Sequence, residues 1–393
     1  MPDKTKKVLI FASLYYPDFV GGAEVAIKEI TDRIPFEEVS FDMVTLRMNS
    51  DLHKSEQIGN IGVYRVGWAK KGIQAGRDIP WYININKYFF LLTGLFKAYR
   101  LHKKNKYDCI WSMMASYNSF TAVLFKILFP KIRFVLTLQE GDPISYIKRR
   151  ALPLYPLFKM IFTKADYIQT ISEYLAKWAR EMGAKCKIEV IPNGVSIDRF
   201  AIDIPLAEKI SIRKSIGFDK DDIVMITTSR LVIKNAINDI ISSLQYLDTK
   251  YKLLIIGSGT EEQNLKSLTR RLGLQDRVVF YGFLRHEDLP KYLVSSQLFV
   301  RPSLSEGLGI SFLEAMACKI PIIGTPVGGI VEFLFDGETG MFAEIKNPKS
   351  IADRVMKIMR MSEVREKIVQ NAFDLIKEKY DWNNISEKIK TIF

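Results

Sequence analysis

The fold of this chain is decided by a stretch that reads Arg301-Pro-Ser-Leu-Ser-Glu306-Gly-Leu-Gly309-Ile-Ser-Phe-Leu-Glu314-Ala-Met-Ala-Cys-Lys-Ile320. An apolar run at 298–300 precedes it and another apolar run follows it. The order predicts a strand, a glycine loop, a helix and a second strand. Glycines let backbone turn sharply and approach a ligand, and the free N–H groups at a helix start attract anions. The stretch therefore predicts a cradle for an anion or a sugar.

Two carboxylates lie eight positions apart around this helix start. Glu306 is expected in the loop, where it can meet the reacting end of a ligand. Glu314 is expected about one turn into the helix, where it can meet more distant hydroxyls. The simpler interpretation is that both are solvated surface charges and that the glycines only make a turn. The spacing alone favours the simpler interpretation.

The flanks of the two glutamates add a resemblance to a known family. Pro-Ser-Leu-Ser-Glu306-Gly-Leu-Gly-Ile-Ser-Phe-Leu-Glu314-Ala-Met-Ala resembles the E-x7-E signature of retaining glycosyltransferases of family 4, also described as glycosyl transferases group 1, which have the GT-B fold. The resemblance implies that Glu306 lies at the donor sugar as a catalytic residue and that Glu314 holds ribose hydroxyls. It also implies that backbone between them meets the sugar and diphosphate. These donor-binding positions are Gly307, Leu308, Gly309, Ile310 and Ser311.

The length of the chain indicates about two domains, because 393 residues exceed what one core usually organises. Alternating strands and helices begin at 8–12 and begin again at 223–229, which predicts doubly wound α/β sheets. The resemblance implies an acceptor-binding Rossmann-like domain at 1–200, a donor-binding one at 201–379 and a cleft between them. A last helix at 380–393 is expected to cross back to the first domain. A single helix is predicted over 351–379.

Two further loops follow predicted strands of the first half. Gly21 and Gly22 lie between a strand and a helix, and the resemblance implies that this double glycine lies near the donor diphosphate. A glycine pair alone is a weak signal. Gln139 follows the strand at 134–138, at a position where many family members have a histidine that contacts the donor sugar. Glutamine both donates and accepts hydrogen bonds, so Gln139 can still bond to a sugar hydroxyl. The difference from histidine therefore concerns which donor sugar is bound.

Two cations follow the strand at 223–229. Arg230 and Lys234 either pair with nearby acids and carbonyls or neutralise a diphosphate leaving group. The resemblance favours the second role, because Ser-Arg-Leu-Val-Ile-Lys-Asn is similar to the diphosphate-binding segment of the family. Ala236 occupies a position where glycine is common. Arg230, Lys234 and Glu306 are therefore the expected catalytic residues.

The net charge of +13 is concentrated in residues 51–150, which hold 17 Lys and Arg against 6 Asp and Glu, a net of +11. Two segments in and beside this region, 81–101 and 146–164, mix basic residues with aromatic and aliphatic ones. Such helices either lie at a membrane interface or face the protein core. The sequence leaves these two interpretations equally weighted.

The function that the sequence favours is transfer of a sugar from a nucleoside diphosphate sugar to an unidentified acceptor hydroxyl, with the lipid-linked or cell-surface glycan precursors as candidate acceptors. No metal-binding signature and no cysteine or histidine cluster is apparent in the sequence, which predicts no metal and no other cofactor. The alternatives are a nucleotide-sugar epimerase and a non-catalytic nucleotide-sugar binder. A nucleic-acid partner ranks last, because no nucleic-acid motif accompanies the charge. The expected location is the cytosol, with peripheral attachment to the inner face of the cell membrane.

Overall fold

The computed structural model describes residues 5–18, 21–73 and 80–393. The chain forms two compact units. Unit 1 comprises residues 1–193 with 382–393, and unit 2 comprises residues 194–381. The sequence predicts a boundary near residue 200 and a returning helix at 380–393.

Unit 1 is built on an eight-stranded sheet with the order β3-β4-β2-β1-β5-β6-β7-β8. Its strands are β1 (Lys6–Phe11), β2 (Val39–Leu46), β3 (Ser55–Ile58), β4 (Ile61–Val66), β5 (Cys109–Met113), β6 (Arg133–Leu138), β7 (Tyr167–Thr170) and β8 (Lys187–Val190). All neighbours pair in parallel except β3 with β4, which are antiparallel. The sequence did not predict β3, because this short strand at the sheet edge is polar and half exposed.

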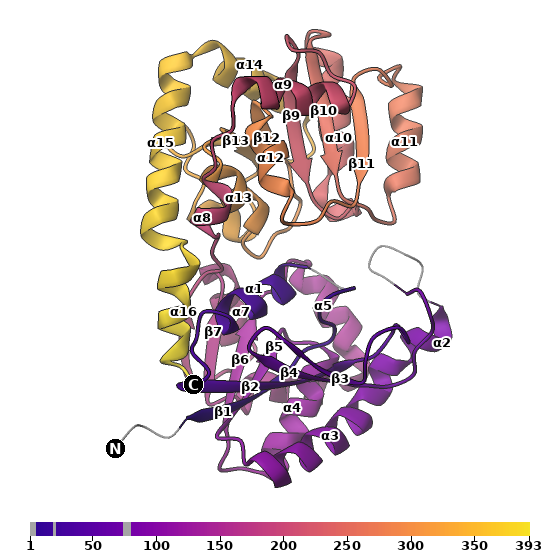
Figure 1. The fold of residues 1–393 in the computed structure, drawn as a ribbon, viewed down its shortest axis with the longest axis vertical. Helices are drawn as coiled ribbons and strands as arrows, with labels where there is room; N and C mark the ends of the chain where they lie inside the picture. The colour runs from indigo at the N-terminus through magenta and orange to yellow at the C-terminus, as the bar shows by residue number, and fades with distance from the viewer. Residues whose placement is uncertain (1–4, 19–20, 74–79) are drawn as a thin grey trace. The chain divides into compact units, whose positions relative to one another are not determined.

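Helices cover both faces of this sheet. They are α1 (Gly22–Thr31), α2 (Trp81–Asn84), α3 (Asn86–Asn105), α4 (Tyr117–Leu128), α5 (Ile144–Ala151), α6 (Tyr155–Thr163), α7 (Glu173–Glu181) and α16 (Trp382–Lys390). Side chains alternate between the faces of a strand, so Val8 and Ile10 of β1 share one core with α1 and α16. Phe11 points to the opposite face and packs against Phe125 of α4. Figure 1 shows α3 and α4 together along that face.

The C-terminal segment belongs to unit 1, as the sequence predicts. Trp382, Ile385 and Ile389 of α16 are buried in the unit 1 core. The Phe393 ring lies 5.0 Å from the Trp111 ring of β5, centroid to centroid. Lys6 donates from Nζ to the carbonyl oxygen of Phe393 at 2.7 Å. Apolar burial and this hydrogen bond hold the end of the chain on the sheet of unit 1.

Unit 2 has a six-stranded parallel sheet with the order β11-β10-β9-β12-β13-β14. The strands are β9 (Ile223–Thr228), β10 (Tyr251–Ile256), β11 (Val278–Gly282), β12 (Leu298–Arg301), β13 (Ile322–Gly324) and β14 (Met341–Phe342). Its helices are α8 (Ile197–Phe200), α9 (Leu206–Ser215), α10 (Ile237–Ser243), α11 (Glu262–Arg271), α12 (Leu289–Val294), α13 (Ile310–Ala317), α14 (Pro348–Arg360) and α15 (Ser362–Lys379). Both units are Rossmann-like α/β domains, as predicted.

The single helix predicted over 351–379 is wrong. The structure has two helices, α14 and α15, and the backbone of Met361 between them is not helical (φ −103°, ψ 80°). Apolar positions continue through this segment with no glycine or proline at the break, so the local pattern indicates no interruption. The break lets α14 bury Ile351 and Val355 in the unit 2 core while α15 takes a different direction.

Candidate active site

The predicted cations and the predicted glutamate follow neighbouring strands of unit 2. β9 and β12 pair in parallel, so their carboxyl ends lie at the same edge of the sheet. Arg230 and Lys234 come after β9, and Glu306 comes after β12. The two loops are also bonded directly, because the Leu304 N–H donates to the carbonyl oxygen of Lys234 at 2.7 Å. The tertiary structure therefore brings these three residues into one region.

A buried arginine at the end of β12 joins the two loops. Arg301 Nη2 donates to Glu306 Oε2 at 2.6 Å and to Asn235 Oδ1 at 3.1 Å. Asn235 Nδ2 in turn donates to the carbonyl oxygen of Arg230 at 2.7 Å. Arg301 Nη1 donates to Ser311 Oγ, in the first turn of α13, at 2.6 Å. Because Arg301 and Glu306 are both only 9% exposed, water competes little for these bonds and the network fixes the Glu306 carboxylate.

Sequence reasoning assigned no role to Arg301 or Asn235. One feature of the sequence indicated that Arg301 has a partner. Arg301 directly follows the buried apolar run at 298–300, and a charge in such a place needs a partner. The identity of that partner depends on which loops the sheet order places together. No local pattern carries that information.

The second glutamate pairs with a histidine. Glu314 is buried in α13, and its Oε1 lies 2.6 Å from His286 Nε2. His286 Nδ1 lies 3.2 Å from Arg199 Nη1. Sequence reasoning gave His286 no role. The pairing orients the Glu314 carboxylate, which lies about one turn into α13.

Backbone conformation shapes the loop between the two glutamates. Gly309 has φ +99° and precedes the first turn of α13, a left-handed conformation that only glycine adopts without strain. Gly328 approaches the same loop so closely that a Cβ there would lie 1.8 Å from the carbonyl oxygen of Glu306. Ala236 after the cationic loop also lies in the left-handed region, at φ +48°. Glycine adopts this conformation without strain, which explains why glycine is common at this position in the family that the sequence resembles.

The two cations differ in their surroundings. Lys234 is half-buried, whereas Arg230 is exposed. Within the described residues, the Arg230 guanidinium has no hydrogen-bond or ion-pair partner, while its carbonyl is held by Asn235. The backbone of Arg230 is therefore fixed and its charge is uncommitted. Such a group is suited to meet an anion that arrives as a ligand.

Among the predicted residues of unit 1, Gly21 and Gly22 lie at the start of α1, and Gln139 directly follows β6. The Gly21 N–H, before α1 and Gly22, donates to Glu24 Oε2 at 2.9 Å. Gln139 and Asn193 exchange two amide hydrogen bonds, at 2.9 and 3.2 Å. Each amide therefore holds the other in one orientation.

Glu140, next to Gln139, is a buried carboxyl that sequence reasoning did not single out. Its Oε1 accepts a hydrogen bond from the Ala115 N–H, and Oε2 is buried without a partner in the described part of the chain. Burial raises the pKa of this carboxyl to about 7, although backbone N–H groups oppose the shift. The side chain ties the loops after β5 and β6 together.

Two family descriptions match this sequence, Glycosyl transferases group 1 over residues 208–375 and Glycosyltransferase Family 4 over residues 20–199. The chain belongs to glycosyltransferase family 4. An uncharacterized glycosyltransferase of Methanocaldococcus jannaschii is 27% identical to it, over 98% of this chain and 97% of the relative. A GDP-mannose-dependent alpha-(1-6)-phosphatidylinositol monomannoside mannosyltransferase of Mycolicibacterium smegmatis is 31% identical over 46% of this chain and 50% of its own.

A solved structure shows the same fold as this glycosyltransferase. Anabaena Alr3699/HepE, crystallised with UDP-glucose, superposes with a TM-score of 0.78 and 17% identity, and the match covers 98% of each chain. The two α/β units of this family 4 glycosyltransferase thus have the GT-B architecture that the sequence predicts.

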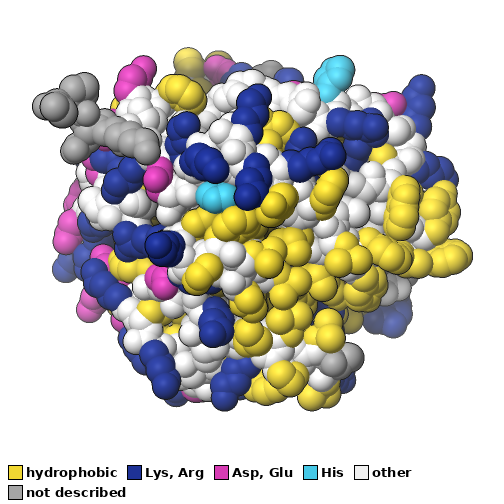
Figure 2. All heavy atoms as spheres, turned by 90° about the horizontal axis from the view of Figure 1, so that it is seen from below, with side chains coloured by type: hydrophobic (Ala, Val, Ile, Leu, Met, Phe, Trp, Pro, Cys, Tyr) yellow, Lys and Arg dark blue, Asp and Glu magenta, His cyan; other side chains and the backbone are white. Residues whose placement is uncertain are grey.

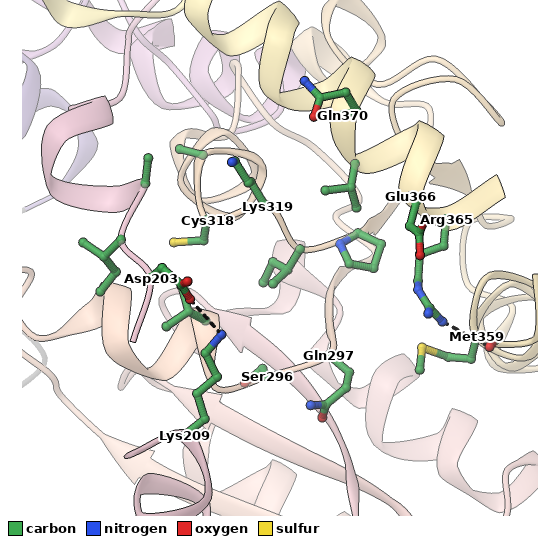
Figure 3. A pocket seen from close by; sticks show the side chains of 17 residues that line it. Asp203, Lys209, Ser296, Gln297, Cys318, Lys319, Met359, Arg365, Glu366 and Gln370 are labelled. Atoms are coloured by element: carbon green, nitrogen blue, oxygen red, sulfur yellow. Dashed lines mark hydrogen bonds and ion pairs between the residues drawn. The ribbon is translucent and has the colours of Figure 1, made fainter. Parts of the chain in front are cut away.

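Unit 2 of the glycosyltransferase also has a cavity of about 710 Å³, which Figure 3 shows with the side chains that line it. Gln297 and Pro321 line it just before β12 and β13, so it opens at the amino ends of these strands. Parallel α/β sheets gather ligands at the carboxyl ends instead. The cavity thiol, Cys318, donates to the carbonyl oxygen of Phe200 at 3.1 Å, and burial raises its pKa well above the ordinary range. The cavity is therefore not the candidate active site.

Proposed function

We propose that this glycosyltransferase transfers a sugar from a nucleoside diphosphate sugar to an acceptor hydroxyl and retains the anomeric configuration. The observation that carries the proposal is the hydrogen-bonded network from Glu306 through Arg301 and Asn235 to the backbone of Arg230. The network holds the Glu306 carboxylate and the Arg230 cation at one edge of the sheet. There the carboxylate can bind the sugar and the cation can bind its diphosphate. Two similar proteins act on or bind such donors, GDP-mannose in one and UDP-glucose in the other.

The chemistry assigned to these residues follows from where charge develops. The bond from the anomeric carbon to the diphosphate oxygen breaks, and a bond to the acceptor oxygen forms on the same face of the sugar. The proton of the acceptor hydroxyl leaves with the departing diphosphate. Negative charge grows on the leaving diphosphate, next to the side chains of Arg230 and Lys234. Preorganised cations at that position lower the barrier. Glu306, oriented by Arg301, lies at the sugar, and Glu314 holds ribose hydroxyls.

The proposal is tested by thermal-shift screening against nucleoside diphosphates and their sugars, followed by acceptor-dependent turnover. A ligand that binds the folded state raises the melting temperature. An epimerase consumes donor without an acceptor, and a non-catalytic binder shows stabilisation without turnover. Absence of stabilisation by every nucleoside diphosphate would overturn the donor assignment.

Glu314→Ala is expected to weaken donor binding by about 1–3 kcal/mol, the usual effect of losing a hydrogen bond to a charged group. The measurement is the donor dissociation constant by calorimetry. Glu338→Ala, which removes an exposed carboxylate elsewhere in unit 2, is the matched control and should bind like the wild type. Equal affinities for the wild type and Glu314→Ala would remove Glu314 from the donor site.

Turnover is expected to continue in the presence of a chelator, because Arg230 and Lys234 supply positive charge at the diphosphate. Among the residues that the structure describes, no three His, Cys, Asp or Glu side chains gather as a metal site. The measurement is the initial rate with and without EDTA. Complete loss of rate with EDTA, restored by magnesium, would show that transfer needs a metal ion.

A surface of exposed aromatic side chains on α2 and α3 supports a lipid-linked acceptor and peripheral membrane attachment. Phe89, Leu92, Phe96 and Tyr99 follow helical spacing along one face of α3, and Trp81 of α2 is 75% exposed. The opposite face of α3 is buried in unit 1, at Phe90, Gly94, Ala98 and Leu101. Figure 2, viewed from the side of α3 and α4, shows a broad hydrophobic area bordered by Lys and Arg side chains.

These exposed side chains of the segment 81–101 therefore do not pack in the protein core. Part of the segment 146–164 does. Phe158, Ile161 and Phe162 of α6 are buried, whereas Leu152 and Leu154 before it are exposed. No helix in the described ranges is both long and apolar enough to span a bilayer. The Mycolicibacterium relative is named for a phosphatidylinositol-based lipid acceptor.

The protein is expected to sediment with anionic liposomes at low salt and to be released at high salt. Each Lys or Arg near an anionic leaflet contributes about 1 kcal/mol, and interfacial aromatic side chains add to this. Phe96→Ser with Leu92→Ser should weaken the binding, while Tyr246→Ser, an exposed aromatic site in unit 2, should not. Absence of binding to anionic liposomes at low salt would refute the membrane attachment and leave the transferase assignment intact.

A further inference from the structure

A cluster of cations and tyrosines lies beside the aromatic surface of unit 1 and is not used by the proposed donor chemistry. Its centre is Tyr117, the first residue of α4. Lys87 Nζ of α3 lies 5.5 Å from the Tyr117 ring centroid, and the Arg150 guanidinium of α5 lies 6.0 Å from it. Arg150 Nη2 donates to the Tyr117 hydroxyl at 3.3 Å. Three separate helices thus bring two positive charges to one phenol.

The positive charges in this cluster are not neutralised by protein carboxylates. Within residues 5–18, 21–73 and 80–393, neither Lys87 nor Arg150 forms an ion pair, and the cations contact aromatic rings instead. Arg150 also lies 5.5 Å from the Tyr146 ring centroid. Cation–aromatic contacts hold side chains in place without cancelling their charge. The cluster is therefore preorganised and still positive.

The pKa of the Tyr117 hydroxyl reflects the positive charge of this cluster. Burial alone would raise the pKa of Tyr117, but hydrogen bonds with Arg150 and Tyr88 and the charges of Arg150 and Lys87 outweigh it, so the pKa lies below its ordinary value. The start of α4 contributes further positive potential at Tyr117, because unsatisfied N–H groups gather at a helix amino end. In the last turn of α5, Lys148 lies 3.7 Å from a carboxylate oxygen of Glu181, whereas Arg150 donates to the Tyr117 hydroxyl of α4.

We propose that Lys87, Tyr117 and Arg150 bind a phosphate group of the acceptor. The site rests on the proposed function, since it names the chemistry of the acceptor for that transfer. Arg150 offers paired N–H donors to phosphate oxygens, Lys87 offers a point charge, and the Tyr117 hydroxyl offers a further donor. Tyr88 and Phe89 connect the site to the exposed aromatic face of α3, so an acceptor with a phosphate next to an apolar chain would contact both.

The test measures phosphate-monoester binding in two arms. One arm titrates glycerol phosphate by calorimetry, and the other sediments the protein with phosphatidylcholine vesicles that contain phosphatidic acid. Lys87→Gln and Arg150→Gln are expected to weaken binding about tenfold or more in the arm that binds. Lys104→Gln, an exposed cation near the other end of α3, is the matched control and should bind like the wild type. Binding in the vesicle arm alone assigns the phosphate to a lipid headgroup, and binding in the soluble arm assigns it to a water-soluble acceptor.

No binding by the wild type in either arm would overturn the site. Equal binding by the wild type and both variants would also overturn it. So would a loss in Lys104→Gln as large as in Lys87→Gln and Arg150→Gln, because that result would mean that binding depends on the overall positive charge of the surface. Melting temperatures establish that the variants fold, and Arg150→Lys should recover part of the affinity. Nucleoside diphosphate stabilisation of the same proteins is measured in parallel. It should be unchanged in the variants, and its absence in the wild type would count against the donor assignment and not against this site.

Discussion

Arg230→Ala is expected to lower kcat by about 10²–10³-fold, because removing a preorganised charge partner of the transition state has effects of this size. The leaving diphosphate gains negative charge as the anomeric bond breaks, so the loss is larger in the transition state than in the bound donor. The Arg230 side chain is exposed and without a partner in the described part of the chain, so its removal breaks no folded-state contact. The measurement is a steady-state series at varied donor concentration.

Two further variants make this result specific. Arg230→Lys keeps the charge but loses the fork of N–H donors, so it should recover part of the rate. Arg271→Ala removes an exposed arginine from α11 of the same unit and should leave kcat unchanged. A change confined to the donor KM in Arg230→Ala would show that Arg230 binds the ground state and the transition state equally.

Arg301→Met is expected to lower the free energy of unfolding by about 3–5 kcal/mol, because removing one member of a buried ion pair leaves the other charge uncompensated. Glu306 loses its partner at 2.6 Å, and the Asn235 and Ser311 oxygens lose theirs at 3.1 and 2.6 Å. The measurement is chemical denaturation followed by circular dichroism. An unchanged midpoint would show that the pair is hydrated in solution.

A second substitution separates stability from catalysis. Glu306→Gln in the Arg301→Met background removes the stranded charge and should recover part of the lost stability. Glu306→Gln alone tests the reacting end of the site, because it keeps the shape of the side chain and removes its charge. Near-native turnover by Glu306→Gln would restrict Glu306 to a structural role.

Local pattern was enough to predict the elements that form the two units. Apolar runs such as Val8–Phe11 and Leu298–Val300 are buried on both faces of parallel sheets, so they are readable without tertiary information. The pattern failed where the deciding feature was not local. Met361 interrupts a helix with no breaker residue, and the edge strand β3 is too polar to be recognised.

The sequence by itself determined the spacing of Glu306 and Glu314 around one helix start and the cations Arg230 and Lys234 after another strand. These follow from chain order, since a loop after a strand and the first turn of a helix are short-range features.

Only the tertiary structure decided which of these groups are neighbours. The pairing of β9 with β12 brings Asn235 to Arg301, and the packing of three helices brings Lys87 and Arg150 to Tyr117. Hydrogen bonds and charge contacts act over a few ångströms, so their partners depend on strand order and helix packing across the whole unit. That is why Arg301, the residue that orients Glu306, had no role assigned until the fold placed it.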